Sequence, residues 1–137
     1  MNLAKMHMFA PVVLRFGLVA LFLWFGLSQV TAPAAWTSWL PTWTSSLPIA
    51  PQQLVLLNGG FEVVFGVLLA IGYWTRLVAL VLAIHLFVIA FEIGYNDIGV
   101  RDFVLGVCTF SLALFIPDRF TADTRRAPPS HGEPGAQ

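Results

Sequence analysis

The chain has almost no cysteine. Its 137 residues include one, Cys108, and a single thiol excludes an internal disulfide, a Cys-x-x-Cys redox pair and a thiolate-rich metal or iron–sulfur site. Cys108 lies in an apolar stretch, where a small buried residue is the simplest interpretation. Dithiol–disulfide chemistry within the chain is therefore excluded.

Charge is equally scarce. Charged residues make up 10% of the chain, against about 25% in an ordinary soluble domain. The formal net charge is zero and no basic run is present, so the electrostatic footprint of a nucleic-acid-binding protein is missing. With 58% hydrophobic residues, the composition indicates one domain in a lipid bilayer.

The sequence contains four apolar segments, at 11–30, 54–74, 77–95 and about 98–116. The first three have the length that a bilayer demands of a spanning helix. The fourth has 14 uncharged residues from Phe103 to Ile116 and reaches that length only if its first turns include Arg101 and Asp102. The pattern predicts an all-α protein, a four-transmembrane-helix bundle over residues 1–117.

The chain changes character after Pro117. Residues 118–137 are rich in Pro, Gly, Thr and Arg and have no apolar periodicity, so we expect a disordered C-terminal tail. An alternative at the other end is a signal peptide cleaved after Ala34. The first segment is long for a signal core and carries Arg15 and Trp24, which favours a four-helix bundle.

Basic residues near the segment ends predict the orientation. Six of the seven fall on one side of the membrane, namely Lys5, Arg15, Arg76, Arg119, Arg125 and Arg126, and only Arg101 falls on the other. The excess of Lys and Arg in cytoplasmic segments places both termini in the cytoplasm of an inner-membrane protein. The uncharged connection 31–52 then lies outside, and its tryptophans are expected to anchor it in the interface, with lining of an apolar ligand site as the alternative.

Glu62 is the most informative residue, because an acid inside a spanning helix is costly. It handles protons or a ligand, or it only pairs with a neighbouring helix, and both interpretations stay open. Helical spacing of three and four allows every ionisable residue at membrane depth to face the interior. The candidates for catalysis are Glu62, Glu92 and His85, and those for substrate binding are Arg15, Gln29, Asn58, Arg101 and Asp102. For His85 the alternative is a hydrogen-bonded core histidine.

Depth along the helices, at about 1.5 Å per residue, suggests the pairing. Glu62, Glu92 and Arg101 fall in the outer half, so Arg101 is expected to pair with Glu92 or Glu62. Arg15 and His85 fall in the inner half. One arginine among several acids leaves at least one carboxyl to hold a proton or meet a ligand.

The sequence lacks the residues that several common kinds of cofactor, metal and catalytic site require. A bis-histidine haem needs facing histidines, and only His85 lies within the membrane segments. No phosphate-binding glycine loop, HExxH pair or nucleophile elbow is present, and two carboxylates with a distant histidine do not predict a metal site. No cofactor is expected from a motif.

Short motifs in a fixed order resemble the DoxX/DoxD-like family of small integral membrane proteins. They are Arg15-Phe16-Gly17-Leu18, Leu23-Trp24-Phe25-Gly26-Leu27-Ser28, Asn58-Gly59-Gly60-Phe61-Glu62 with Gly66 and Gly72, Thr75-Arg76-Leu77, and Gly99-Val100-Arg101-Asp102. The resemblance covers residues 13–117 and implies a compact four-helix membrane protein. Where the family pattern has a lysine after the glycine of the first segment, this chain has Gln29.

The resemblance also implies membrane redox work, since the family takes its name from subunits associated with quinol oxidase and thiosulfate:quinone oxidoreductase. We therefore expect an accessory subunit in quinone-linked or other redox chemistry, with a soluble or membrane redox partner and room for a quinone. Whether the chain is itself an enzyme stays open. The alternatives are a small proton-coupled transporter or exporter of an apolar or weakly acidic molecule, and a non-catalytic membrane scaffold. The sequence does not specify an oligomeric state.

Overall fold

The computed structural model describes residues 3–115 and 121–123, and its long elements are all helices. In chain order they are α1 (Leu3–Thr31), the short 3-10 helices η1 (Pro33–Trp39) and η2 (Thr42–Ser46), α2 (Pro51–Ile71), α3 (Thr75–Ile93) and α4 (Asp97–Leu114). The predicted all-α bundle is confirmed. The long helices correspond to the four predicted segments, although α1 begins eight residues before its segment; the other boundaries are shifted by a few residues.

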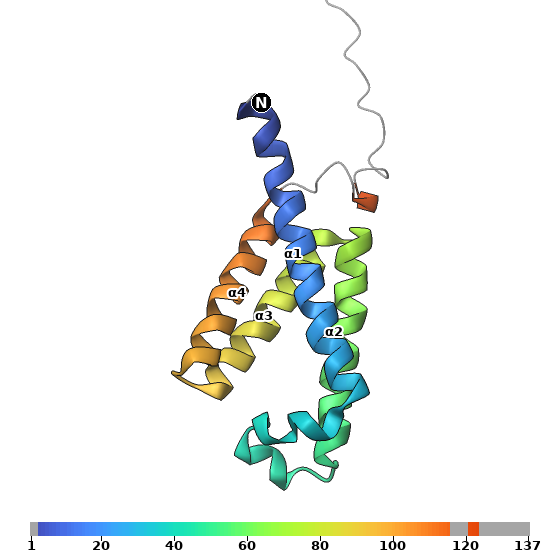
Figure 1. Cartoon of the computed structure of the whole chain (residues 1–137), viewed down its shortest axis with the longest axis vertical. Coiled ribbons are helices and arrows are strands. Elements are labelled where there is room, and N and C mark those ends of the chain that lie inside the picture. The colour runs from blue at the N-terminus through green and yellow to red at the C-terminus, as the bar shows by residue number, and fades with distance from the viewer. Residues whose placement is uncertain (1–2, 116–120, 124–137) are drawn as a thin grey trace, which may run out of the picture.

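The four long helices form two antiparallel pairs. α1 packs along α2, α3 packs along α4, and contacts between the pairs are fewer. The pairs lie close together near the α2–α3 turn and diverge toward the opposite end, where η1 and η2 lie (Figure 1). We call these two ends the turn end and the loop end.

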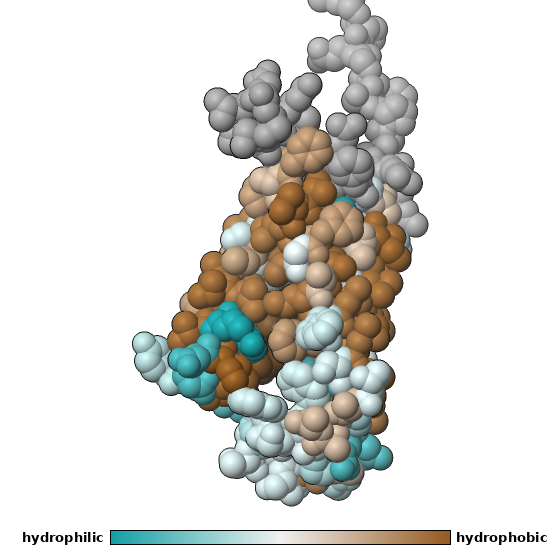
Figure 2. Space-filling view, in the orientation of Figure 1, coloured by the Kyte–Doolittle hydropathy of each residue, from teal (hydrophilic) through white to brown (hydrophobic). Residues whose placement is uncertain are grey.

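Three helices are long and apolar enough to cross a bilayer, over Phe9–Thr31, Pro51–Ile71 and Thr75–Ile93. α4 has 18 residues and carries Asp97, Arg101 and Asp102 in its first two turns. Figure 2 shows a largely hydrophobic surface over the helices on the face in view and a more hydrophilic surface at the loop end. Large apolar side chains such as Trp24 and Phe91 are exposed on the long helices, as expected of a surface that faces lipid.

Glycines bring α1 and α2 into close contact. A Cβ atom added to Gly26 would lie 2.8 Å from the carbonyl oxygen of Gly59, and one added to Gly59 would lie 2.8 Å from that of Gly26. Further along α2, Gly66 lies against Phe22 and Leu23. This close packing fixes the register of the two helices.

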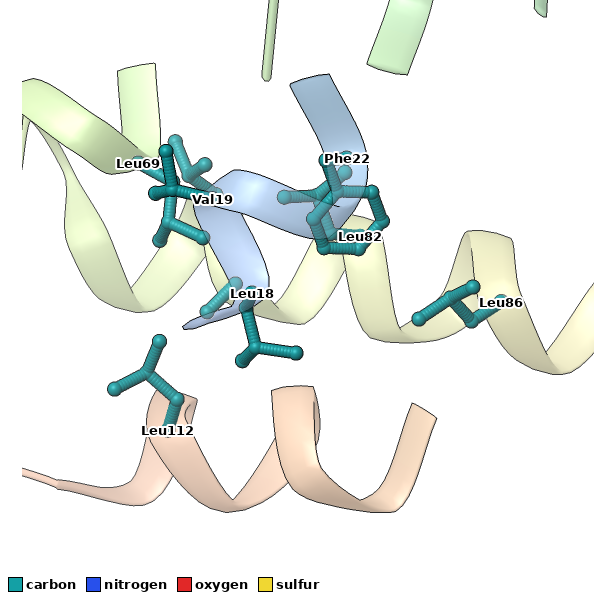
Figure 3. Packing of buried hydrophobic residues seen from close by; sticks show 9 residues of the cluster. Leu18, Val19, Phe22, Leu69, Leu82, Leu86 and Leu112 are labelled. Atoms are coloured by element: carbon teal, nitrogen blue, oxygen red, sulfur yellow. The ribbon is translucent and has the colours of Figure 1, made fainter. Parts of the chain in front are cut away.

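The apolar core fills the half of the bundle nearer the turn end. Its buried members come from all four long helices and include Leu18, Val19, Phe22, Leu69, Val78, Ala79, Leu82, Leu86 and Leu112. Figure 3 shows the α1 side chains inserted between Leu69, Leu82 and Leu112. Along α1, residues at steps of three and four from Arg15 to Gln29 form a stripe that is buried along its whole length.

A short C-terminal piece docks on the α2–α3 turn. The turn is tight, with positive φ at Gly72 (73°) and at Trp74 (49°). Asp123 accepts hydrogen bonds from the backbone N–H of Trp74 and Thr75 and from the Thr75 hydroxyl, and Thr121 is fully buried against Gly72. Residues 121–123 therefore differ from the expected disordered tail, because a carboxylate caps the exposed N–H groups of α3. The rest of 116–137 lies outside the described residues.

Candidate functional site

Glu62 lies at the centre of a polar cluster between the apolar core and the loop end. It is 4% exposed. Its Oε2 accepts a hydrogen bond from Gln29 Nε2 at 3.3 Å, and its Oε1 accepts one from Asn58 Nδ2 at 3.1 Å. The same Asn58 nitrogen donates to Gln29 Oε1 at 2.7 Å. The three side chains form a closed triangle that joins α1 to α2.

His85 on α3 reaches the same carboxyl group. Its Nε2 lies 3.2 Å from Glu62 Oε1, and its ring is 4.7 Å from that of Phe61. The sequence-based depths, which put His85 in the inner half and Glu62 in the outer half, were wrong. Counted from the shared α2–α3 turn, the two residues stand nearly equally far along their helices, ten or so residues each, so they meet. The pair can hold one proton, either on the imidazole or on the carboxyl group.

A cavity of about 450 Å³ lies at the loop end, where the two helix pairs diverge. Gln29, Asn58 and His85 line it, so part of the Glu62 cluster forms its polar floor. Apolar side chains from every long helix but α1 form much of the remaining wall, among them Leu54, Val55, Val88, Ile89, Ile93 and Ile98. An apolar enclosure with a few convergent polar groups is typical of a small-molecule site.

The connection between α1 and α2 closes over this cavity. Trp36, Trp39 and Trp43 all line it, and two of them are fixed by hydrogen bonds. The Trp36 indole N–H donates to Ser28 Oγ at 3.2 Å, and the Trp43 indole N–H donates to Glu92 Oε2 at 2.9 Å. These contacts tie the connection to α1 at one point and to α3 at another. The tryptophans therefore line a cavity, and their anchoring in the membrane interface stays a prediction.

Arg101 does not pair with Glu62 or Glu92, contrary to the prediction. Its Nε donates to Asp102 Oδ1 at 2.8 Å, and its guanidinium carbon lies 5.3 Å from the centre of the Phe25 ring. The prediction failed because it considered only partners on other helices and overlooked Asp102, the next residue in the sequence. Arg101, Asp102 and Glu92 all line the cavity.

Arg15 lies at the other end of the molecule. It is fully buried, and its Nη1 donates to the carbonyl oxygens of Leu69 at 3.0 Å and Ala70 at 2.8 Å. These are carbonyls of the last turn of α2, where a cation also complements the helix dipole. Of the eight residues predicted for the site, the structure brings seven to the cavity or its floor and places Arg15 apart from them.

Sequence reasoning offered the loop only as an alternative lining of a ligand site and missed its contact with Glu92. Nothing in the spacing of the tryptophans connects Trp43 with Glu92, which lies 49 positions later. The signal that could have found the Glu62–His85 pair was available, because the short turn makes α2 and α3 a hairpin and sets their register. Within the part of the chain that the structure describes, no three His, Cys, Asp or Glu side chains gather as a metal ion would require.

The helices, their apolar belt and the enclosed polar cluster define a multi-pass α-helical membrane protein. The family described as DoxX matches residues 10–94, more than half of the chain. The protein belongs to the DoxX family. No curated protein and no solved structure matches it significantly.

Proposed function

We propose that this protein is an accessory membrane subunit in quinone-linked redox chemistry and that its loop-end cavity holds the quinone head group. The observation that carries the proposal is the composition of that cavity: aromatic and aliphatic walls over a floor where His85 meets the buried Glu62 at 3.2 Å. A quinone ring is flat and apolar, with two carbonyl oxygens that need hydrogen-bond donors. The cavity supplies both kinds of contact.

The chain's own residues would handle protons. Reduction of a quinone takes up two electrons and two protons, and oxidation of the quinol releases them. Glu62 and His85 share one proton position, and Asn58 and Gln29 hold the carboxyl group in place. A hydrogen-bonded carboxyl–imidazole pair of this kind can accept or return a proton at a ligand oxygen near His85.

The electrons would come from a partner oxidoreductase. The family match supports such a partner, because DoxX-like proteins take their name from subunits of quinone-linked enzymes. The excess of Lys and Arg near the other end supports an orientation with the loop end on the outer face of the inner membrane. Purification from native membranes, with a co-purifying soluble or membrane oxidoreductase as the scored outcome, tests the subunit role.

Binding of a short-chain quinone tests the site. The purified protein in lipid nanodiscs is titrated with a decyl-substituted benzoquinone, and affinity is measured by equilibrium dialysis with subtraction of the uptake by empty nanodiscs. We expect saturable binding that Ile89→Trp abolishes, because the larger ring fills the cavity that Ile89 lines. The matched control is Ile84→Trp, on the same helix at an exposed position outside the lining. Binding that Ile89→Trp leaves intact would overturn the proposal.

A proton-coupled transporter of an apolar or weakly acidic molecule is the second candidate function. The buried Glu62 beside a cavity favours it, since a carboxyl group at this depth can couple ligand release to a proton. The packed core between the polar cluster and the turn end favours the subunit role. Proton-gradient-driven uptake of a ligand into proteoliposomes would support transport, and a Glu62-independent role in assembly would support a membrane scaffold.

A further inference from the structure

The walls of the loop-end cavity carry more negative than positive charge. The acids Glu92 and Asp102 line it, and Glu62 lies just beneath its floor. Arg101 is the only Lys or Arg among the lining residues, and its Nε already donates to Asp102 at 2.8 Å. An anionic ligand would therefore meet the Glu92 carboxylate, which has no cationic partner among the described residues, with Glu62 and its partner His85 behind the floor.

Three tryptophan rings, those of Trp36, Trp39 and Trp43, also line the cavity. The indole N–H groups of Trp36 and Trp43 are occupied by Ser28 and Glu92, so a ligand meets these two residues mainly through carbon surface. Indole faces attract organic cations more strongly than any other side-chain ring. Glu92 holds a carboxylate at the edge of the Trp43 ring, which combines both attractive groups at one place.

We propose that the same cavity binds lipophilic organic cations, such as aromatic ammonium or phosphonium ions, and rejects anions of the same size. The proposal rests on the ligand site of the preceding section but not on that site accepting a quinone. A delocalised cation keeps little water, so it can exchange its hydration for indole faces and a carboxylate. The neutral quinone and the cation would then compete for one space.

Tetraphenylphosphonium and tetraphenylborate provide a matched pair of probes, because they have nearly the same size and shape and opposite charge. Each is titrated into the protein in neutral-lipid nanodiscs, with binding to empty nanodiscs subtracted, and each is tested for displacement of the bound decyl-benzoquinone. We expect saturable binding of the cation and at least tenfold weaker binding of the anion. Equal affinities for the two probes would overturn the proposal.

Two conservative variants test the source of the selectivity. Glu92→Gln keeps an acceptor for the Trp43 N–H and removes the charge, so the cation should bind about five- to tenfold more weakly, as expected for one partly exposed charge. Asp102→Asn keeps an acceptor for Arg101 but frees its charge, so affinity for the borate should rise. The control is Asp97→Asn, which removes an acid outside the lining. Cation affinity unchanged by Glu92→Gln would contradict the proposed contact.

The outcomes separate the two proposals. Quinone binding without cation binding overturns this inference and leaves the proposed function standing. Cation binding without quinone binding overturns the proposed quinone site and leaves this inference standing. Binding of neither probe by a correctly folded protein, verified by its thermal unfolding transition, overturns both.

Discussion

Glu62 takes part in a hydrogen-bond triangle that only an acid satisfies. One nitrogen of Asn58 contacts both Gln29 and Glu62, and Gln29 also contacts Glu62. If the acid is replaced by an amide, two donors or two acceptors face each other at one corner, whichever way the three amides are turned. A carboxyl group avoids the conflict because both of its oxygens accept.

Replacing Glu62 by Gln is therefore expected to lower the free energy of unfolding by about 1–3 kcal/mol, the usual cost of a buried unsatisfied polar group. Chemical unfolding of the detergent-solubilised protein measures it. Adding Asn58→Ala removes the conflicting corner, so the double variant should lose less than the two single losses combined. Full additivity would show that the triangle is not closed in the folded protein.

His85 extends this cluster to a third helix. His85→Phe keeps the packing against Phe61 and removes the nitrogen that lies near Glu62. We expect a stability change below about 1.5 kcal/mol, because the hydrogen bond is partly exposed, together with at least a tenfold loss of quinone affinity. Unchanged affinity would remove His85 from the ligand site.

At the scale of elements, the contact between α1 and α2 depends on glycine at specific positions. Gly59→Ala would place a Cβ atom 2.8 Å from a backbone oxygen of α1, so the helices must separate, and we expect a loss of about 1–3 kcal/mol. Gly60→Ala is the matched control, since nothing lies within 4 Å of its Cβ position and alanine favours the helix. Comparable losses for both variants would contradict the close packing.

The α2–α3 turn depends on the docked C-terminal residues. Asp123→Ala removes the acceptor for two backbone N–H groups and the Thr75 hydroxyl, and we expect a loss of about 1–2 kcal/mol, typical of a helix N-cap. Truncation after residue 123 should cost little, whereas truncation before Thr121 should cost at least as much as Asp123→Ala. Equal stability of the two truncated proteins would show that residues 121–123 do not support the turn.

The sequence predicted the elements better than their contacts. Apolar runs of spanning length located α1 to α4, and steps of three and four indicated that the ionisable residues at membrane depth face the interior. Contacts across helices also require the register of each pair, and for α1 and α2 the close backbone approach at Gly26 and Gly59 sets it. The partners of Arg101 and Asp123 depend on local geometry and a capping contact, and apolar periodicity carries no information about either.

In the whole molecule, one end of the bundle is packed and the other holds a cavity. At the turn end lies the apolar core. Arg15 of α1 also binds the last turn of α2 there, and Asp123 binds the first turn of α3. The loop end holds the cavity and its polar floor. The distribution of Lys and Arg predicts that the loop end faces outward, which gives the ligand access from the outer leaflet.

Topology is tested by labelling in intact cells. In a Cys108→Ala background, a cysteine at Thr42, exposed in η2, should react with a membrane-impermeant maleimide. A cysteine at Asp123's neighbour Ala122 should react only after the membrane is opened. The opposite pattern would reverse the orientation and place the cavity on the cytoplasmic side.

Photoaffinity labelling with an azido-benzoquinone, followed by peptide mapping, tests directly whether a quinone binds in the loop-end cavity. We expect the label to attach to the connection containing Trp36 to Leu47 and to α3 between Val88 and Ile93, and we expect decyl-benzoquinone to protect these sites. Label on the lipid-facing surface alone, or label there that the competitor does not displace, would contradict a quinone site in the loop-end cavity.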